Sequence, residues 1–436
     1  MADITTTRIF TDGEKGITAA KLNDIIGSST IQPAFVSTKP VASTADPADN
    51  MLILKAAGAY AQVPVSTLTT SIGNALPSPD SEIWLVRLRS FNAVGNPNFE
   101  VDQRNVGTLI ANPAGAGPDR WLQSKAGTLV ASGQQVGGAV AIPGINFSIT
   151  RAFYRFTLTT QQASLGISDF LRLYQFVEGS SLRELISDVT SISLLVRTSV
   201  AGLKFSVMIQ DNPATKTLVK LATIPSANTW TLIQLPNLPQ MTVGNFAVVP
   251  GVVGYLLQIT LAAGANLLAP AADTWQAGNF MGAPGMSNFA ASPVNSTFDI
   301  AFLHHEPGPL CSTLIDKPFT QNLDECLRYY QKSYDYDVAL GTANAVGYLQ
   351  GVQQTTTAIA GAFRFFKPMA KIPTVTCYNM QTGGVNGIRL AGIDYAVSSI
   401  NSPGKSGFVG MITGSAMPAP TAGSMLAFHY TADTGW

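Results

Sequence analysis

The sequence predicts an all-β protein, and three observations support that prediction. From about residue 81 onward, apolar and polar residues alternate in short runs, which is the period of a half-buried β-strand. Glycine, proline and asparagine cluster between the runs, as turn residues do. Helical spacing is confined to short stretches. We therefore expect an N-terminal arm with a short helix, a jelly-roll-like β-sandwich, a short linking helix and a C-terminal β-sandwich.

The composition narrows the class of protein. Charged residues make up 12% of the chain, about half of the roughly 25% that is usual in soluble proteins. Basic and acidic residues balance at 26 each, which argues against a nucleic-acid partner and against an anionic membrane surface. No run of about 18 uninterrupted apolar residues occurs, so membrane insertion is not expected. The surface must be neutral and rich in hydroxyl or amide groups, or partly buried against other subunits.

The cysteines indicate the compartment in which the chain is made. Cys311, Cys326 and Cys377 are too few and too scattered for a disulfide framework or a four-ligand zinc site. The opening residues, MADITTTRIFTDGEKG, carry no apolar signal segment. Free thiols and synthesis in a reducing cytoplasm are therefore expected.

The first segment, residues 1–80, begins with a short helix. Leu22, Ile25 and Ile26 form one apolar stripe at i, i+3 and i+4. The stretch after it is rich in proline, alanine, serine and threonine, which predicts an extended arm. One small hairpin is expected within the arm, over residues 51–63.

The alternating apolar runs in residues 81–310 predict one large domain. A strand that buries four apolar side chains gains on the order of 6–12 kcal/mol of gross transfer free energy, most of which backbone ordering offsets. The core must therefore be shared by many antiparallel strands, as in a sandwich or jelly roll. The clearest apolar faces are Leu203, Phe205, Val207 and Ile209 in LKFSVMIQ, Tyr255, Leu257, Ile259 and Leu261 in GYLLQITLA, and Phe298, Ile300 and Phe302 in TFDIAFLH.

Residues 311–436 predict the linking helix and a smaller β-sandwich. Strands are expected at residues 361–366, 373–380, 407–413 and 424–432, the last with Leu426, Phe428 and Tyr430 on one face.

The linking helix lies at DECLRYYQKSYD (324–335), which is unusually rich in charge, and Asn322 with Glu325 forms a capping-box-like pair. The helix is too short to be stable alone, so its apolar stripe is expected to pack at a domain or subunit interface. A solvated helix without an interface role is the alternative. The stripe consists of Leu323, Cys326, Leu327 and Tyr330, and the residues expected to face solvent or another subunit are Arg328, Tyr329, Gln331 and Lys332.

Several stretches, taken together, resemble one known family. They are NPNFEVDQRNVG (96–107) with DRW (119–121), LYQFVEGSSLRELI (173–186), FLHHEPG (302–308), FHYTADTGW (428–436) and, near the N-terminus, DGEKGITAAKLN (12–23). In order and spacing they resemble virion proteins of tailed bacteriophages, chiefly tail-fibre and receptor-binding proteins with a carbohydrate-binding-like sandwich. The chain departs from the family at Asp102, where tryptophan is usual, and at His304 and His305, where glutamine and leucine are usual.

The resemblance implies a function and partners. The chain is expected to be a structural tail-fibre protein of the virion, made in the bacterial host cytoplasm and assembled as a homotrimer. Its arm, with Leu22, Ile25 and Ile26, would attach it to other virion proteins, and the rest would contribute to host-surface attachment by binding a glycan. The alternatives are a head or collar decoration fibre or a connector without receptor binding, and a glycan-cleaving tailspike.

Aromatic residues are the candidate glycan contacts, because ring faces pack on the C–H surfaces of sugars. They are Trp121, Trp230, Tyr255 and Trp275. Acidic pairs exist, Asp335 with Asp337 and Glu178 with Glu184, but neither lies in a catalytic motif, so no enzyme activity is expected.

No cofactor or metal is expected either. His304 and His305 are adjacent, would point to opposite faces of a strand, and are predicted to be buried. Gln175 and Glu178 are expected on a helical turn. Arg104 and Arg120 are expected to bridge to acidic neighbours, namely Glu100, Asp102 or Asp119.

Overall fold

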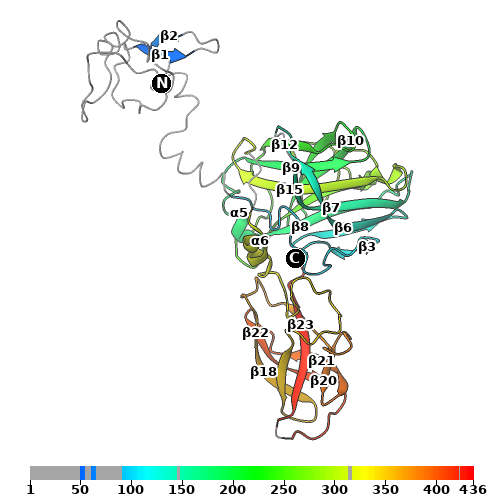
Figure 1. Ribbon diagram of the computed structural model, residues 1–436. Helices are drawn as coiled ribbons and strands as arrows, with labels where there is room; N and C mark the ends of the chain where they lie inside the picture. The colour runs from blue at the N-terminus through cyan, green and yellow to red at the C-terminus, as the bar shows by residue number, and fades with distance from the viewer. Residues whose placement is uncertain (1–49, 55–59, 65–90, 145–147, 313–316, 422) are drawn as a thin grey trace, which may run out of the picture. The chain divides into compact units, whose positions relative to one another are not determined.

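The computed structural model describes residues 50–54, 60–64, 91–144, 148–312, 317–421 and 423–436, and the chain divides into two units after residue 87. Strands make up almost all regular structure in these ranges (Figure 1). The all-β class predicted from the alternation is therefore confirmed. No helix in the described ranges combines the length and the apolar character needed to cross a membrane.

The first unit contains the predicted hairpin. Strand β1 (Asn50–Leu54) pairs antiparallel with β2 (Tyr60–Pro64), so the hairpin prediction is confirmed. The predicted helix with Leu22, Ile25 and Ile26 lies outside the described residues.

The second unit begins with a sandwich of two antiparallel sheets (Figure 1). One sheet has the order β14 (Trp275–Ala277), β11 (Lys216–Ile224), β10 (Leu203–Asp211), β13 (Val253–Ala263), β8 (Phe170–Glu178), β5 (Leu122–Ala126) and β4 (Gly115–Ala116). The other has the order β12 (Thr231–Leu238), β9 (Thr190–Thr198), β15 (Thr297–Pro307), β7 (Ser148–Thr160), β6 (Val130–Ala141) and β3 (Ile110–Ala111). Short helical turns, α5 (Gly179–Leu182), η1 (Ala265–Leu267) and η2 (Phe289–Ala291), join some strands. The many pairings between strands distant in sequence are typical of a jelly roll.

The core lies between the two sheets and contains the apolar faces predicted for β10 and β13. In β15, Phe298 and Ile300 join this core, but Phe302 does not, so its predicted position is wrong. A register shift between Ile300 and Phe302, where β15 pairs with β9, inserts one extra residue. Leu303 therefore points inward, and Phe302 packs on the other face with Trp230.

The C-terminal block is built around one long strand, β23 (Met425–Asp433), which pairs with four others. Its first half pairs with β17 (Leu349–Gln353) and β20 (Gly387–Leu390), and its second half with β16 (Tyr330–Lys332) and β19 (Thr374–Tyr378). β18 (Ala358–Arg364), β22 (Gly407–Thr413) and β21 (Ile393–Asn401) complete a ring from β17 back to β20. Leu426, Phe428 and Tyr430 face the core of this block, as predicted.

The linking helix is shorter than predicted. Helix α6 (Phe319–Cys326) follows Pro318, and Asn322 lies in its interior, where its side-chain nitrogen donates to Asn98 at 2.9 Å. Asn322 is therefore not a cap. Tyr330 belongs to β16 rather than to the apolar stripe of the helix, because the chain turns after Cys326 and pairs with β23.

We call residues 328–332 the junction segment, because it joins α6 to the C-terminal block. Tyr329, Gln331 and Lys332 in it are buried, which corrects the prediction that they face solvent. The Gln331 amide donates to two backbone carbonyls and its oxygen accepts from the Phe366 amide. The Lys332 ammonium donates to three carbonyls, at 2.7–2.9 Å. These polar groups are buried because backbone groups satisfy them.

Glu178 ties the junction segment to the sandwich. It ends β8, a strand and not the predicted helical turn, and is 2% exposed. Its carboxylate accepts from Arg328 Nη2 at 2.6 Å, from the Tyr329 hydroxyl and from the Gly251 amide. Burial alone would raise the pKa of Glu178, but these hydrogen bonds outweigh burial and lower the pKa to about 2.

We expect the core of the sandwich to be intolerant of truncation at Phe298, whose ring contacts Phe205 at 5.2 Å between centroids. Phe298→Ala should lower the free energy of unfolding by about 3–5 kcal/mol, because it removes buried surface and leaves a cavity. Ile167→Ala, at a side chain that is 63% exposed, is the matched control and should change little. Chemical denaturation measures both, and equal losses would contradict this account of the core.

Glu178 should make stability depend on acid pH. Because its pKa is lower in the folded chain than the ordinary 4.5, the ionised carboxylate stabilises the fold above about pH 4.5 and loses that effect as the pH falls toward 2. Between about pH 6 and pH 3 the wild type should lose about 2 kcal/mol more than Glu178→Gln. Denaturation at a series of pH values measures the difference, and parallel curves for the two proteins would refute the assignment.

Candidate functional site

Two of the four predicted glycan contacts lie in the core. Trp121 and Tyr255 have no exposed surface. The Trp121 ring stacks on Phe99 at 4.9 Å and its nitrogen donates to the Asn96 carbonyl. The Tyr255 hydroxyl bonds the ring of His305 at 2.7 Å. Neither side chain can reach a ligand at the surface, so the prediction of glycan contact is wrong for both.

The other two predicted contacts are also committed to packing. Trp230 is 7% exposed, donates to the Ala139 carbonyl and carries the Arg197 guanidinium 4.5 Å above its ring. It belongs to a different apolar cluster from Trp121 and Tyr255. Trp275 is half-buried and its nitrogen donates to the Gln240 carbonyl at 3.0 Å. The four side chains therefore do not form one binding surface.

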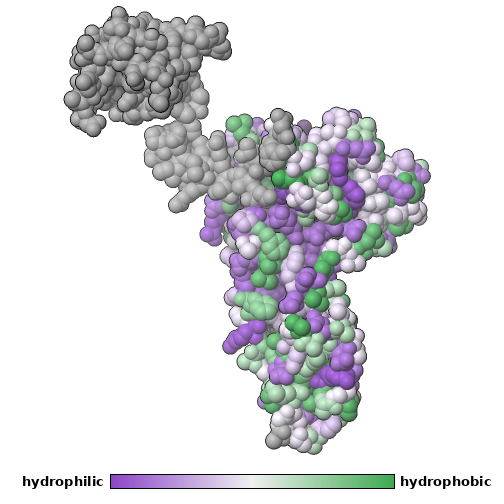
Figure 2. Space-filling view, viewed as in Figure 1, coloured by the Kyte–Doolittle hydropathy of each residue, from purple (hydrophilic) through white to green (hydrophobic). Residues whose placement is uncertain are grey.

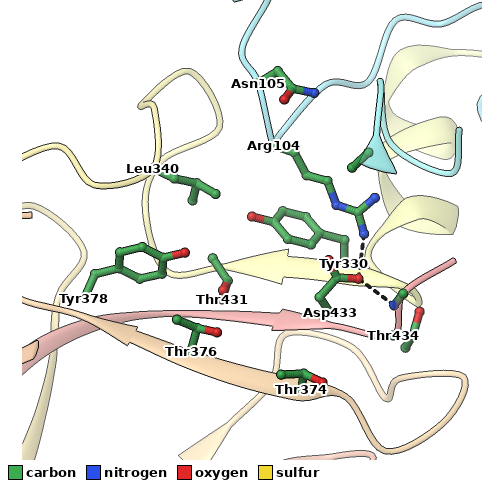
Figure 3. Close-up of a pocket in the computed structure, with 12 residues that line it drawn as sticks. Arg104, Asn105, Tyr330, Leu340, Thr374, Thr376, Tyr378, Thr431, Asp433 and Thr434 are labelled. Carbon is green, nitrogen blue, oxygen red and sulfur yellow. Dashed lines mark hydrogen bonds and ion pairs between the residues drawn. The ribbon is translucent and has the colours of Figure 1, made fainter. Parts of the chain in front are cut away.

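An open pocket of about 500 Å³ lies elsewhere, where a loop of the sandwich meets β16, β19 and β23 (Figure 3). We call it the Arg104 pocket. Its lining consists of Arg104, Asn105, Ala116, Tyr330, Leu340, Thr374, Thr376, Tyr378, Thr431, Asp433, Thr434 and Gly435.

Strand alternation places most of this lining. In β19, Thr374, Thr376 and Tyr378 line the pocket, whereas Cys377 between them is buried in the core of the block. Directly paired residues point to the same face of a sheet. Thr376 pairs with Thr431 on β23, and on the other side of β23 Tyr330 pairs with Asp433, so three strands present one polar surface.

Arg104 lines the pocket on the side of the sandwich (Figure 3). Its side chain is 6% exposed, and its Nη2 donates to Asp433 Oδ1 at 2.7 Å. The guanidinium lies 4.4 Å from the centre of the Tyr330 ring. Its Nε and Nη1 have no hydrogen-bond partner among the described residues. Arg104 therefore pairs with Asp433 at the far end of the chain, and not with the nearby acidic residues that the sequence suggested.

The pocket offers further unfilled polar groups. The Tyr330 hydroxyl is buried and has no partner in the described part of the chain, and Figure 3 shows it directed toward the Tyr378 hydroxyl. Burial raises the pKa of Tyr330, so its phenol stays protonated and can donate a hydrogen bond. With the threonine hydroxyls and the apolar Leu340, the lining suits a polar, uncharged ligand.

The arrangement does not bring two carboxylates together. Of the described residues that line the Arg104 pocket, Asp433 is the one acid, and it is bonded to Arg104. Asp335 and Asp337 are exposed on a loop. Glycoside hydrolysis ordinarily needs two carboxyl groups across the scissile bond, about 5–10 Å apart.

Buried acids near the pocket hold the loop that carries Arg104. The Asp102 carboxylate accepts from the Asn105 and Gly107 amides, and Asp119 accepts from Gln103. Burial raises the pKa of Asp119 to about 6. Neither acid bonds to Arg104 or Arg120 as the sequence suggested, because backbone amides and the side-chain amides of Gln103 and Asn105 use the carboxylate oxygens.

The structure shows no metal cluster in the ranges that it describes, by the criterion of three or more His, Cys, Asp or Glu side chains together. His304 and His305 are buried, as predicted. Their rings bond to Phe91, Tyr255 and Thr190.

Sequence reasoning named Arg104 and Tyr330 for other roles and missed Thr376, Tyr378 and Asp433. The stretch PTVTCYNM was predicted as a strand, and its alternation of threonine with valine and cysteine was the available signal for a polar outer face. Nothing in the sequence pairs Asp433 with Arg104, since 329 positions separate them.

Comparison with known proteins gives matches in structure only. No protein-family model matches the chain, and no curated protein matches it in sequence. Eighteen solved chains match its structure. Six of them have 9–14% identity and TM-scores of 0.24–0.27, and matches at this level do not show what this chain binds.

Three of these structures illustrate the range. A family 61 carbohydrate-binding module in complex with β-1,4-galactotriose is 14% identical, with 50% of this chain and 99% of that one covered, at a TM-score of 0.26. A family 11 carbohydrate-binding module from Clostridium thermocellum, in complex with a mixed-linked tetrasaccharide, is 13% identical, with 47% of this chain and 98% of that one covered, at a TM-score of 0.25. The enzymatically active domain of tailspike protein 4 of bacteriophage CBA120 is 11% identical, with 49% of this chain and 21% of that one covered, at a TM-score of 0.24.

Proposed function

We propose that this chain is a fibre protein of a tailed-bacteriophage virion that helps to attach the particle to a glycan on the host surface, and that the Arg104 pocket binds the glycan. One observation carries the proposal. The stretches 96–107 and 428–436, which resemble the phage family in sequence, meet at this pocket through the bond between Arg104 and Asp433.

The chemistry of the pocket favours a neutral sugar. Arg104 and Asp433 offset each other in charge, and the remaining polar groups are hydroxyls and one amide. Hydroxyls can donate to and accept from the hydroxyls of a sugar, and a guanidinium can donate to them, while Leu340 and the Tyr378 ring can contact the C–H surface of the sugar. The volume of about 500 Å³ falls within the range of small-molecule sites. With one carboxylate in the lining, the pocket would bind a glycan and not cleave it.

The proposal also includes the assembly of the chain as a homotrimer in the virion, anchored through the N-terminal arm. The low charge supports it, because neutral surfaces can be buried between copies at little desolvation cost. Figure 2 shows hydrophobic side chains distributed over the C-terminal block. Large apolar side chains there, each at least 54% exposed, are Val346, Val352, Phe366, Ile372, Val385, Ile393 and Val409.

A connector without receptor binding is the second candidate. It is favoured by the burial of Trp121, Trp230 and Tyr255, which leaves none of these rings open to a sugar.

The glycan site can be tested with full-length protein on an array of bacterial surface glycans. Thr376→Val with Tyr330→Phe removes two hydroxyls and little volume, and should weaken binding about tenfold. Thr160→Val, at an exposed strand end in the sandwich, is the control and should bind as the wild type does. Unchanged binding by the double variant would place the site elsewhere, and no binding by the wild type would favour the connector.

The trimer can be tested by light scattering on the purified protein. We expect a mass near three times that of the 45.9 kDa chain. A monomer at micromolar concentration would contradict the trimer. It would not affect the glycan site, which the glycan array tests separately.

A further inference from the structure

A second pocket, of about 390 Å³, lies beside the junction segment, and we call it the Arg120 pocket. Two consecutive residues line different pockets: Tyr330 lines the Arg104 pocket, and Tyr329 lines the Arg120 pocket. Residues 91–95 of the sandwich and two residues of α6, Gln321 and Glu325, also line it. This pocket shares no lining residue with the Arg104 pocket, so it is a separate candidate site.

Arg120 is a buried cation without an acidic partner. It is 4% exposed, and its Nη2 donates to the Phe176 carbonyl at 2.6 Å. The guanidinium lies 3.6 Å from the centre of the Tyr329 ring. No carboxylate of the described chain lies within ion-pair distance of Arg120, and its Nη1 has no hydrogen-bond partner there. Glu178, the acid that lines the same pocket, is bonded to Arg328 and Tyr329.

A buried guanidinium in this state is costly, because water no longer solvates it and only a ring face and one carbonyl replace that solvation. Burial accordingly lowers the pKa of Arg120. The Arg120 side chain packs closely on Gly95, since a Cβ at residue 95 would lie 3.0 Å from Arg120 Nε. The fold therefore holds a cation in place and leaves part of its bonding capacity unused.

The lining as a whole carries more basic than acidic side chains. Four basic side chains, Arg120, Lys317, Arg328 and Lys367, and two acidic ones, Glu178 and Glu325, give it a net charge of +2 in a chain whose overall charge is zero. Lys317, Arg328 and Lys367 are each paired with an acid, the last with Asp324 outside the lining, so among the described cations of this lining Arg120 is the one without an acidic partner. Ser180 and Ser181 add hydroxyl donors. An anion with two or three acceptor oxygens matches this set, because the planar guanidinium donates in a fork to such groups.

We propose that the Arg120 pocket binds a small oxyanion, with Arg120 as the residue that contacts it. Inorganic phosphate and the carboxylate of an acidic sugar share this chemistry, and either would supply the negative charge that Arg120 lacks. The Arg104 pocket, where Asp433 already neutralises the arginine, would not select an anion. The two pockets thus differ in ligand charge, and the oxyanion site stands whether or not the glycan proposal does.

The test compares thermal unfolding of the full-length wild type with that of Arg120→Met, which keeps the length of the side chain and removes its charge. Sodium phosphate and sodium glucuronate are each added against sodium chloride of equal ionic strength. At about tenfold excess over Kd, one or both oxyanions should raise the Tm of the wild type by about 2–4 °C. The one that does so identifies the source of the oxyanion.

Arg120→Met should abolish the oxyanion response. In chloride, its Tm reports the loss of the Tyr329 contact and the Phe176 hydrogen bond, offset by the removal of an unpaired buried charge. Arg389→Met, at an arginine paired with Asp394 on the C-terminal block, is the matched control and should respond as the wild type does. The proposal is overturned if neither oxyanion raises the Tm of the wild type above that in chloride. It is equally overturned if Arg120→Met still responds, since an arginine with a merely structural role would lower the Tm in every salt and leave the response intact.

Discussion

The arrangement of the second unit depends on the burial of the junction segment, residues 328–332, between the sandwich and the C-terminal block. Tyr329 ends the turn after α6, and Tyr330 begins β16. The Tyr329 ring contacts Arg120 and the Tyr330 ring contacts Arg104, at 3.6 and 4.4 Å from guanidinium to ring centre. Three residues of β16 pair with β23 at the same time. A single short segment thus fixes two loops of the sandwich to β23, the strand around which the C-terminal block is built.

This arrangement explains why both pockets lie at the junction. Each is walled by residues from both blocks, so neither exists until the blocks have docked. The docking combines an apolar cluster, formed by Val253, Tyr329, Ala370 and Trp436, with buried polar contacts. Lys332 is 3% exposed and donates to three carbonyls, and burial lowers its pKa to about 8. Directional hydrogen bonds of this kind permit one orientation of the blocks, whereas an apolar contact of equal area would tolerate several.

The sequence predicted the parts that depend on local periodicity. The strands β10, β13 and β23 and their inward faces follow from alternation, because burial of one face requires it. Phe302 could not be predicted, since one inserted residue in β15 reverses the facing of the residues after it. Tyr330 was assigned to the helix because its spacing also fits the i+7 position of a helical stripe. The buried Gln331 and Lys332 were assigned to the surface because the carbonyls that satisfy them are distant in sequence or in a turn. The candidate site was missed for the same reason.

Some of the buried polar groups without a partner lie at the junction. Buried polar groups in native proteins are nearly always hydrogen-bonded, and exceptions call for a reason. Arg104, Arg120 and Tyr330 each keep a buried donor without a partner in the described chain and line one of the two pockets, whereas atoms of Gln123, Ser193 and Tyr430 in the same state lie outside the pockets. Had the junction been selected for adhesion alone, apolar side chains at these positions would hold the blocks together without such cost. Donors that remain unused beside an opening reduce stability in the empty state and recover it when a ligand supplies acceptors, which is the energetic effect that both proposed sites require.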